Sequence, residues 1–107
     1  MKKKNSAVMC KDGFIMSVQA SSHAYCSPRE DNSRYHEVEV GYPSEVEPLL
    51  MPYAENPSKP TQTVYGYVPC STVYLVITKH GGMVRGTVPS GVPVYEHMWS
   101  GDKNEDR

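Results

Sequence analysis

Apolar and acidic residues alternate between residues 35 and 42. Val38 and Val40 share one side of an extended chain, and Glu37 and Glu39 share the other. This period-two pattern is typical of a strand with one buried face. A proline follows the segment, and since proline has no backbone N–H to donate to a neighbouring strand, we expect the strand to end there.

Further segments have the composition of strands. Residues 14–20 form a short apolar segment, and residues 61–68 are rich in β-branched and aromatic side chains. Residues 83–88 and 92–97 flank Pro89-Ser90-Gly91, which is typical of the connection in a hairpin. Together with the alternating segment, they predict a small, mainly antiparallel sheet of about four to five strands.

Residues 70–80 fit either a strand or a helix. Their β-branched content favours a strand, but one helix face would carry side chains at positions i, i+3, i+4 and i+7: Val73, Val76, Ile77 and His80. A proline before the segment and a glycine after it are typical helix start and stop signals. We therefore predict a helix over about residues 70–80 that covers the sheet, and the predicted fold class is α+β.

The proline-rich segment 43–60 is predicted to be an ordered loop with one helical turn. It contains five prolines, which exclude a long helix or a central strand. Its apolar side chains, above all Leu49 and Leu50, are expected to hold the loop against the core.

The domain boundaries follow from the composition of the two ends. Residues 1–12 are predicted to form a flexible basic extension and residues 13–99 a single α+β domain. Residues 100–107 contain nothing to bury and are predicted to be a disordered tail. Met16 could serve as an alternative translation start, and the sequence does not decide between Met1 and Met16.

Tyrosine replaces the usual large apolar residues in this chain of 107 residues. The chain contains 8 Tyr but only 1 Phe and 1 Trp, and Leu, Ile, Val and Phe together number 19. A small core cannot bury many tyrosines with satisfied hydroxyl groups, whereas interaction surfaces favour tyrosine. We therefore expect a protein-binding surface that uses some of four tyrosines: Tyr53, Tyr65, Tyr67 and Tyr95.

The net charge of −1 hides an uneven distribution of charge. Residues 30–55 contain seven acidic residues, and Arg34 is the one lysine or arginine among them. Such an acidic block can engage a basic surface on a partner protein. The candidate acidic contacts are Glu37, Glu39, Glu45 and Glu47.

The basic N-terminus indicates an alternative partner. Four lysines occupy the first eleven positions without an acidic residue: Lys2, Lys3, Lys4 and Lys11. With Tyr65 and Tyr67, which would share one strand face as base-stacking side chains do, they could bind nucleic acid. Four lysines neutralise only about four phosphates, so this attachment would be weak and salt-sensitive.

Few residues are suited to catalysis or metal binding. The three cysteines show no short repeated spacing, and His23 with Cys26 makes only half of a four-ligand zinc site, so we predict no metal and no cofactor. A small enzyme is the third interpretation of the sequence. It would use Cys70, near a helix N-terminus, or Glu37 and Glu39 as an acid–base pair.

Four segments in the middle of the chain are considered together: EVEVGYP at 37–43, LLMPYAE at 49–55, TVYGYVP at 63–69 and KHGG at 79–82. In these segments, within about residues 16–82, the chain resembles small uncharacterised proteins of tailed phages and prophages. The resemblance implies no activity. It does imply an origin, an accessory phage protein of a kind that binds and inhibits a host protein.

We therefore expect a small non-enzymatic protein-interaction module that binds a host protein, or a second copy, through a basic surface of the partner. No segment approaches the roughly 18 apolar residues of a membrane-spanning helix, so no membrane partner is expected. The N-terminus lacks the apolar stretch of a signal peptide, which predicts a cytoplasmic location, in the host cell if a phage encodes the protein. The partner's identity, the oligomeric state and the strand order are not determined by the sequence.

Overall fold

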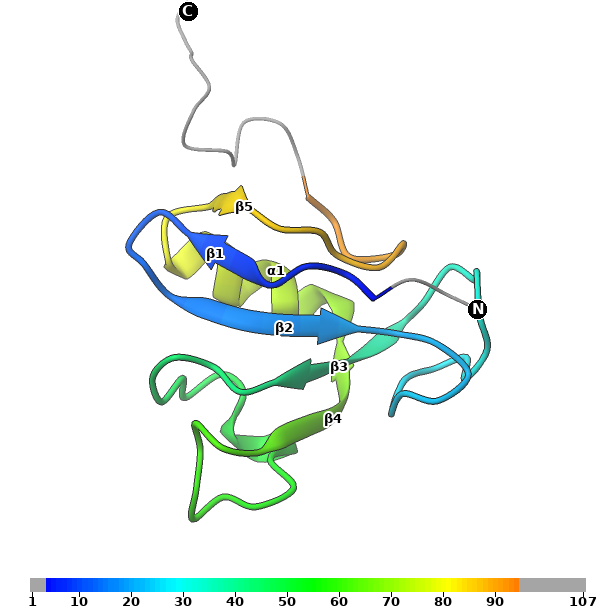
Figure 1. The fold of residues 1–107 in the computed structure, drawn as a ribbon, viewed down its shortest axis with the longest axis horizontal. Coiled ribbons are helices and arrows are strands. Elements are labelled where there is room, and N and C mark those ends of the chain that lie inside the picture. Colours follow the sequence, from blue (N-terminus) through cyan, green and yellow to red (C-terminus); the bar gives the residue numbers. More distant parts are fainter. Residues whose placement is uncertain (1–3, 95–107) are drawn as a thin grey trace, which may run out of the picture.

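Strands make up most of the regular structure in residues 4–94, the part of the chain that the computed structural model describes. The strands are β1 (Val8–Cys10), β2 (Ile15–Gln19), β3 (Glu37–Gly41), β4 (Val64–Pro69) and β5 (Met83–Arg85). They form one sheet in the order β4-β3-β2-β1-β5, and all neighbours are antiparallel. A 3-10 helix, η1 (Met51–Tyr53), and an α-helix, α1 (Cys70–Lys79), accompany the sheet (Figure 1). The predicted α+β class is confirmed.

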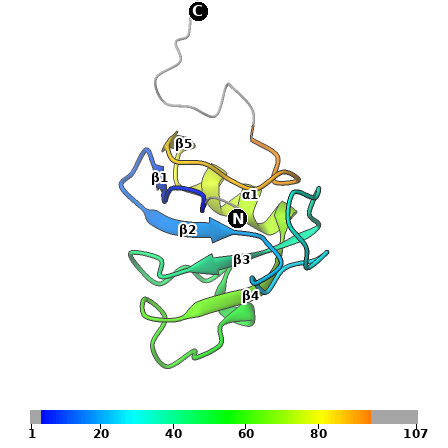
Figure 2. The ribbon, with the colours of Figure 1, turned by 45° about the vertical axis from the view of Figure 1, so that its right-hand side comes forward.

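Helix α1 packs against one face of the sheet, and Figures 1 and 2 both show it behind the strands. Val73, Val76 and Ile77 are fully buried, so the predicted apolar face of the helix is the one that meets the core. The helix begins directly after β4 and ends with His80 as its C-cap. The helical interpretation of residues 70–80 is therefore confirmed, and the strand interpretation is wrong.

The alternation predicted for β3 is present, and it continues into its neighbour with one irregularity. Val38 and Val40 are fully buried and pair with Val68 and Tyr65 of β4. Two residues of β4 thus lie opposite Glu39 alone, which is a β-bulge. Because the bulge shifts the alternation by one position, the residue after Gly66 is directed outward instead of staying on the side of Tyr65.

The predicted flexible extension over residues 1–12 is wrong at its C-terminal end. β1 lies inside the sheet, between β2 and β5, with Val8 and Cys10 buried. Only three residues alternate here, beside several lysines, which is too short a pattern to predict a strand. The ordered domain therefore includes residues that the sequence assigned to the extension, and the predicted tail over 100–107 lies outside the described residues.

The predicted hairpin over 83–88 and 92–97 is also wrong in its pairing. β5 ends at Arg85 and pairs with β1, and residues 86–94 form no strand. Gly86 has φ +108°, and a Cβ there would lie 2.2 Å from the carbonyl oxygen of Ala7, so only glycine fits where the chain passes close to the start of β1. The chain then turns away, with Tyr35 donating its N–H to Ser90. Residues 95–97 lie outside the described part of the chain.

The proline-rich segment follows its prediction in outline. It is an ordered loop containing one helical turn, η1, and Leu50 anchors it in the core. Leu49 was expected to do the same but is exposed, because the turn that buries Leu50 directs its neighbour to the surface.

Candidate functional site

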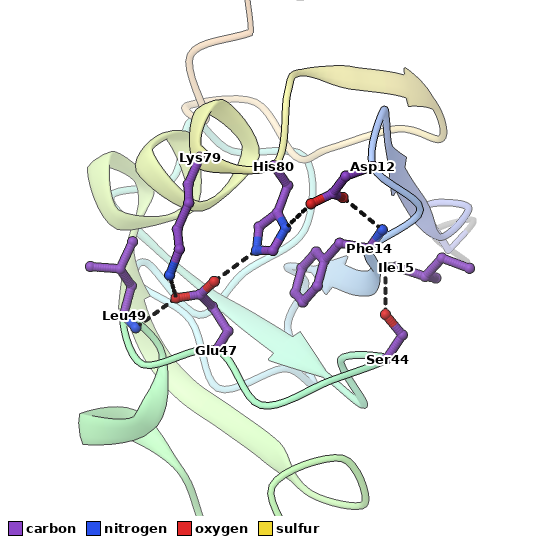
Figure 3. Close-up of polar contacts among 8 residues, drawn as sticks. All are labelled: Asp12, Phe14, Ile15, Ser44, Glu47, Leu49, Lys79 and His80. Atoms are coloured by element: carbon purple, nitrogen blue, oxygen red, sulfur yellow. Dashed lines mark hydrogen bonds and ion pairs between the residues drawn. The ribbon is translucent and has the colours of Figure 1, made fainter.

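Four charged side chains meet where the C-terminal end of α1 approaches two loops, and we call them the His80 network: Asp12, Glu47, Lys79 and His80 (Figure 3). The Nδ1 atom of His80 lies 2.7 Å from Asp12 Oδ2, and its Nε2 atom lies 2.7 Å from Glu47 Oε1. Lys79 Nζ is 2.9 Å from the other oxygen of Glu47. The carboxylate of Glu47 is 1% exposed and the imidazole of His80 is 7% exposed.

The geometry of the network favours the protonated form of His80. Ionised carboxylates only accept hydrogen bonds, so an imidazole between two of them must donate from both nitrogens. Both hydrogen bonds to ionised carboxylates are therefore made only when His80 is an imidazolium. The Phe14 ring stacks on it with centroids 4.0 Å apart and shields it from water.

The pKa values of the network agree with that protonation state. Burial alone would lower the pKa of His80, but the hydrogen bonds to Glu47 and Asp12 outweigh it, and the pKa is raised above its ordinary value. Burial would likewise raise the pKa of Glu47. Hydrogen bonds from the backbone N–H of Leu49 and from the side chains of His80 and Lys79 outweigh burial and hold this pKa below its ordinary value. The pKa of Asp12 is lowered, first by the N–H of Phe14 and then by His80.

The His80 network holds three segments of the chain together and is not arranged for acid–base catalysis. A general base needs a free nitrogen near a substrate proton, and both nitrogens of His80 are engaged. The network joins the β1–β2 turn at Asp12, the loop before η1 at Glu47 and the end of α1. These three segments are distant in sequence, so the network fixes their relative positions.

A second group of side chains lies on the sheet face that α1 does not cover, and we call it the tyrosine cluster: Tyr25, Arg29, Glu39, Glu55 and Tyr67. The rings of Tyr25 and Tyr67 are 6.1 Å apart and tilted by 34°. The guanidinium carbon of Arg29 lies 5.5 Å from the centre of the Tyr25 ring. The two tyrosines are 40% and 44% exposed, so this aromatic pair faces solvent.

The backbone holds both tyrosines in place. Tyr25 donates its N–H to Glu39 Oε1 at 2.8 Å, and its carbonyl accepts the N–H of Tyr67 at 3.0 Å. Tyr67 has φ +54°, a left-handed conformation that costs a non-glycine residue about 1–3 kcal/mol. Gly66 leaves room for Tyr25, since a Cβ there would lie 3.3 Å from Tyr25 Cβ. The fold therefore fixes the backbone from which the exposed pair projects.

The four predicted tyrosines occupy different environments. Tyr67 is exposed, but Tyr65 is fully buried and its hydroxyl donates to the carbonyl of Pro60, so Tyr65 cannot contact a partner. The bulge in β4 causes this difference. Tyr53 is half-buried against the core, and Tyr95 lies outside the described residues.

The four predicted glutamates also lie in different environments. Glu37 and Glu39 are half-buried on the uncovered face of the sheet, and Glu45 is exposed in the loop after β3. Glu47 is buried in the His80 network and is therefore unavailable to a partner.

The groups proposed for nucleic-acid binding do not come together. Lys4 and Lys11 are exposed, while Lys2 and Lys3 lie outside the described residues. The predicted shared face of Tyr65 and Tyr67 is absent because Tyr65 points into the core. No pair of base-stacking rings therefore exists at these two positions.

The thiols suggested for an enzyme lack the necessary environment. Cys10, Cys26 and Cys70 are all buried. Burial, assisted by the nearby Asp12, raises the pKa of Cys10 to about 11, and burial also raises the pKa of Cys70. A reactive thiol needs a lowered pKa. Within residues 4–94, no group of three or more His, Cys, Asp or Glu side chains is placed to hold a metal ion.

Sequence reasoning missed the His80 network and, in the tyrosine cluster, Tyr25 and Arg29. One signal was present for the first, because His80 falls on the apolar face of the predicted helix and a buried histidine requires partners. Its partners are distant in sequence, so they could not be named. Tyr25 and Arg29 lie in a loop whose path over the sheet has no sequence pattern.

Comparison with protein-family models, with curated proteins and with solved structures finds no match for this chain. Among residues 4–94 there is also no helix with the length and hydrophobicity needed to cross a membrane.

Proposed function

We propose that the protein is a small interaction module that binds a basic surface of another protein through the tyrosine cluster. The observation that carries this proposal is the exposed Tyr25–Tyr67 pair, which is held in place by hydrogen bonds and by a left-handed residue. Rigid aromatic side chains at a surface supply contact area at low cost in conformational entropy. Two carboxylates beside the rings, Glu39 and Glu55, favour a cationic partner.

The partner that we propose is a host protein bound by a phage accessory protein. The resemblance of residues 16–82 to small proteins of tailed phages supports this origin. The His80 network then has a supporting role, since it holds the loops in one arrangement without taking part in contact.

A co-purification experiment with matched tyrosine variants tests the proposal. Tyr67→Ala removes one ring of the cluster, and Tyr42→Ala removes another exposed tyrosine that also has positive φ. The tagged protein and the Tyr42→Ala variant are expected to retain one stoichiometric protein from a bacterial host lysate, and Tyr67→Ala is expected to lose it.

Two results would contradict the proposal. One is an eluate without a stoichiometric partner. The other is a partner retained equally by Tyr67→Ala and Tyr42→Ala, provided that both variants unfold at the temperature of the parent protein.

A further inference from the structure

The face of the Tyr25 ring already carries a cation from the same chain. The guanidinium carbon of Arg29 lies 5.5 Å from the ring centre, within the range of a cation–π contact. Arg29 is exposed, and within residues 4–94 it makes no ion pair with a carboxylate. Such a contact at an exposed site is weak, so a better-placed cation could displace Arg29.

A carboxylate beside the rings has no cationic partner among the described residues. Glu55 is exposed, and its Oε2 atom lies 3.6 Å from the position of a Cβ on Gly66. That position also lies 3.3 Å from Tyr25 Cβ, so the carboxylate and the base of the aromatic side chain flank the same glycine. None of the ion pairs formed by residues 4–94 includes Glu55.

The missing group is one that combines a flat face with hydrogen-bond donors. A guanidinium stacks on a tyrosine ring and donates two parallel hydrogen bonds to a carboxylate, whereas an ammonium is a compact and strongly hydrated charge. We infer that the tyrosine cluster binds an arginine side chain of the partner, which displaces Arg29 from Tyr25 and pairs with Glu55. This inference rests on the proposed function and names the group that the surface recognises.

A titration followed by NMR tests the inference with defined probes. The ¹⁵N-labelled protein is titrated with three capped tripeptides, Gly-X-Gly, in which X is arginine, lysine or the neutral analogue citrulline. The arginine peptide is expected to cause saturable shifts at Tyr25, Gly66 and Tyr67, the lysine peptide weaker shifts, and the citrulline peptide none.

Two variants separate the internal cation from the carboxylate. Arg29→Gln removes the competing guanidinium, so the affinity for the arginine peptide should rise about two- to fivefold. Glu55→Gln removes the ion pair and should lower that affinity about three- to tenfold. Glu45→Gln, an exposed glutamate in the loop after β3, is the control and should leave the affinity unchanged.

The inference is overturned by equal shifts with arginine and lysine, by no saturable shift with arginine, or by an Arg29→Gln variant that binds no more tightly than the parent. These failures are distinct from failure of the proposed function. If Tyr67→Ala still abolishes partner retention, the surface binds its partner through another group. If Tyr67→Ala has no effect on retention, the surface is not the binding site at all.

Discussion

The His80 network and the tyrosine cluster both combine charged and aromatic side chains, but they differ in how far their hydrogen-bonding groups are used. In the network, both nitrogens of His80 and both oxygens of Glu47 have partners within 2.9 Å. In the cluster, Arg29 faces only a ring and Glu55 forms no ion pair with the other described residues. A saturated group stabilises the fold, whereas an unsaturated one can still attract a partner.

The two regions also differ in burial, and burial determines how much an ion pair contributes to stability. Breaking a buried ion pair leaves an uncompensated charge and costs about 3–5 kcal/mol, whereas an exposed pair contributes about 0–1 kcal/mol. Substitutions in the network should therefore reduce stability, and substitutions in the cluster should change binding.

The largest effect on stability is expected for Glu47→Ala. The change leaves Lys79 without its carboxylate and the buried imidazolium of His80 with one partner instead of two. The free energy of unfolding should fall by about 3–5 kcal/mol, measured by urea denaturation. Glu45→Ala, two residues earlier and exposed, should stay within about 0.5 kcal/mol of the parent. Equal losses in the two variants would remove the distinction between the regions.

The stability that the network contributes should be lost both at high pH and at low pH. The pKa of folded His80 is raised, so its contribution is complete below about pH 6.5 and is lost as the pH rises through the folded pKa. The pKa values of Asp12 and Glu47 are lowered, so their contribution is present above about pH 4.5 and is lost as the pH falls through the folded values.

His80→Gln isolates the alkaline side of this dependence. The difference in free energy of unfolding between the parent and the variant should be greatest between about pH 4.5 and 6.5. It should shrink by about 1–3 kcal/mol as the pH rises through the raised folded pKa of His80, because neutral histidine can donate only one of the two hydrogen bonds. A difference that stays constant over this range would show that the pKa of His80 is the same in the folded and the unfolded protein.

A smaller effect should distinguish the two tyrosines on either side of the bulge. Tyr65→Phe leaves the carbonyl of Pro60 without its hydroxyl donor and should cost about 1 kcal/mol. Tyr67→Phe removes an exposed hydroxyl and should leave the unfolding temperature unchanged. If Tyr67→Phe were the more costly change, the assignment of one ring to the core and the other to the surface would be reversed.

The smallest change in stability is expected for Glu55→Gln. Because the carboxylate is exposed and has no ion pair with the other described residues, the free energy of unfolding should change by less than about 0.5 kcal/mol. Thermal unfolding followed by circular dichroism is sufficient to check this. A clear loss of stability would mean that Glu55 belongs to the architecture, as Glu47 does.

Regular elements of this fold could be predicted wherever the hydrophobic period extended over enough residues. The helix face of α1 and the alternation of β3 are local patterns, so the sequence contains all the information needed to recognise them. β1 has only three residues and could not be recognised. The hairpin prediction failed for a related reason, since the true partner of β5 lies near the other end of the chain.

The members of the His80 network and the tyrosine cluster were harder to predict from the sequence, because these residues come together only in the tertiary structure. His80 and Asp12 are 68 positions apart, and nothing in the spacing connects them. Gly66 in the interior of a strand pattern was one usable signal for the bulge, because glycine there often marks such an irregularity. Without the register of β3 against β4, that signal could not decide which tyrosine faces solvent.

The position of β1 also determines when the sheet can be completed during synthesis. One edge of β1 pairs with β5, and Met9 of β1 lies opposite Arg85 of β5. The hydrogen bonds between these two strands can therefore form only after Arg85 has been synthesised. On the ribosome, β1 can join β2 at once, but its other edge stays open until nearly the whole described chain has emerged. Contacts of such long range close slowly. A chain interrupted anywhere before β5 would therefore present an unpaired strand edge, and incomplete products of this protein should be prone to aggregation.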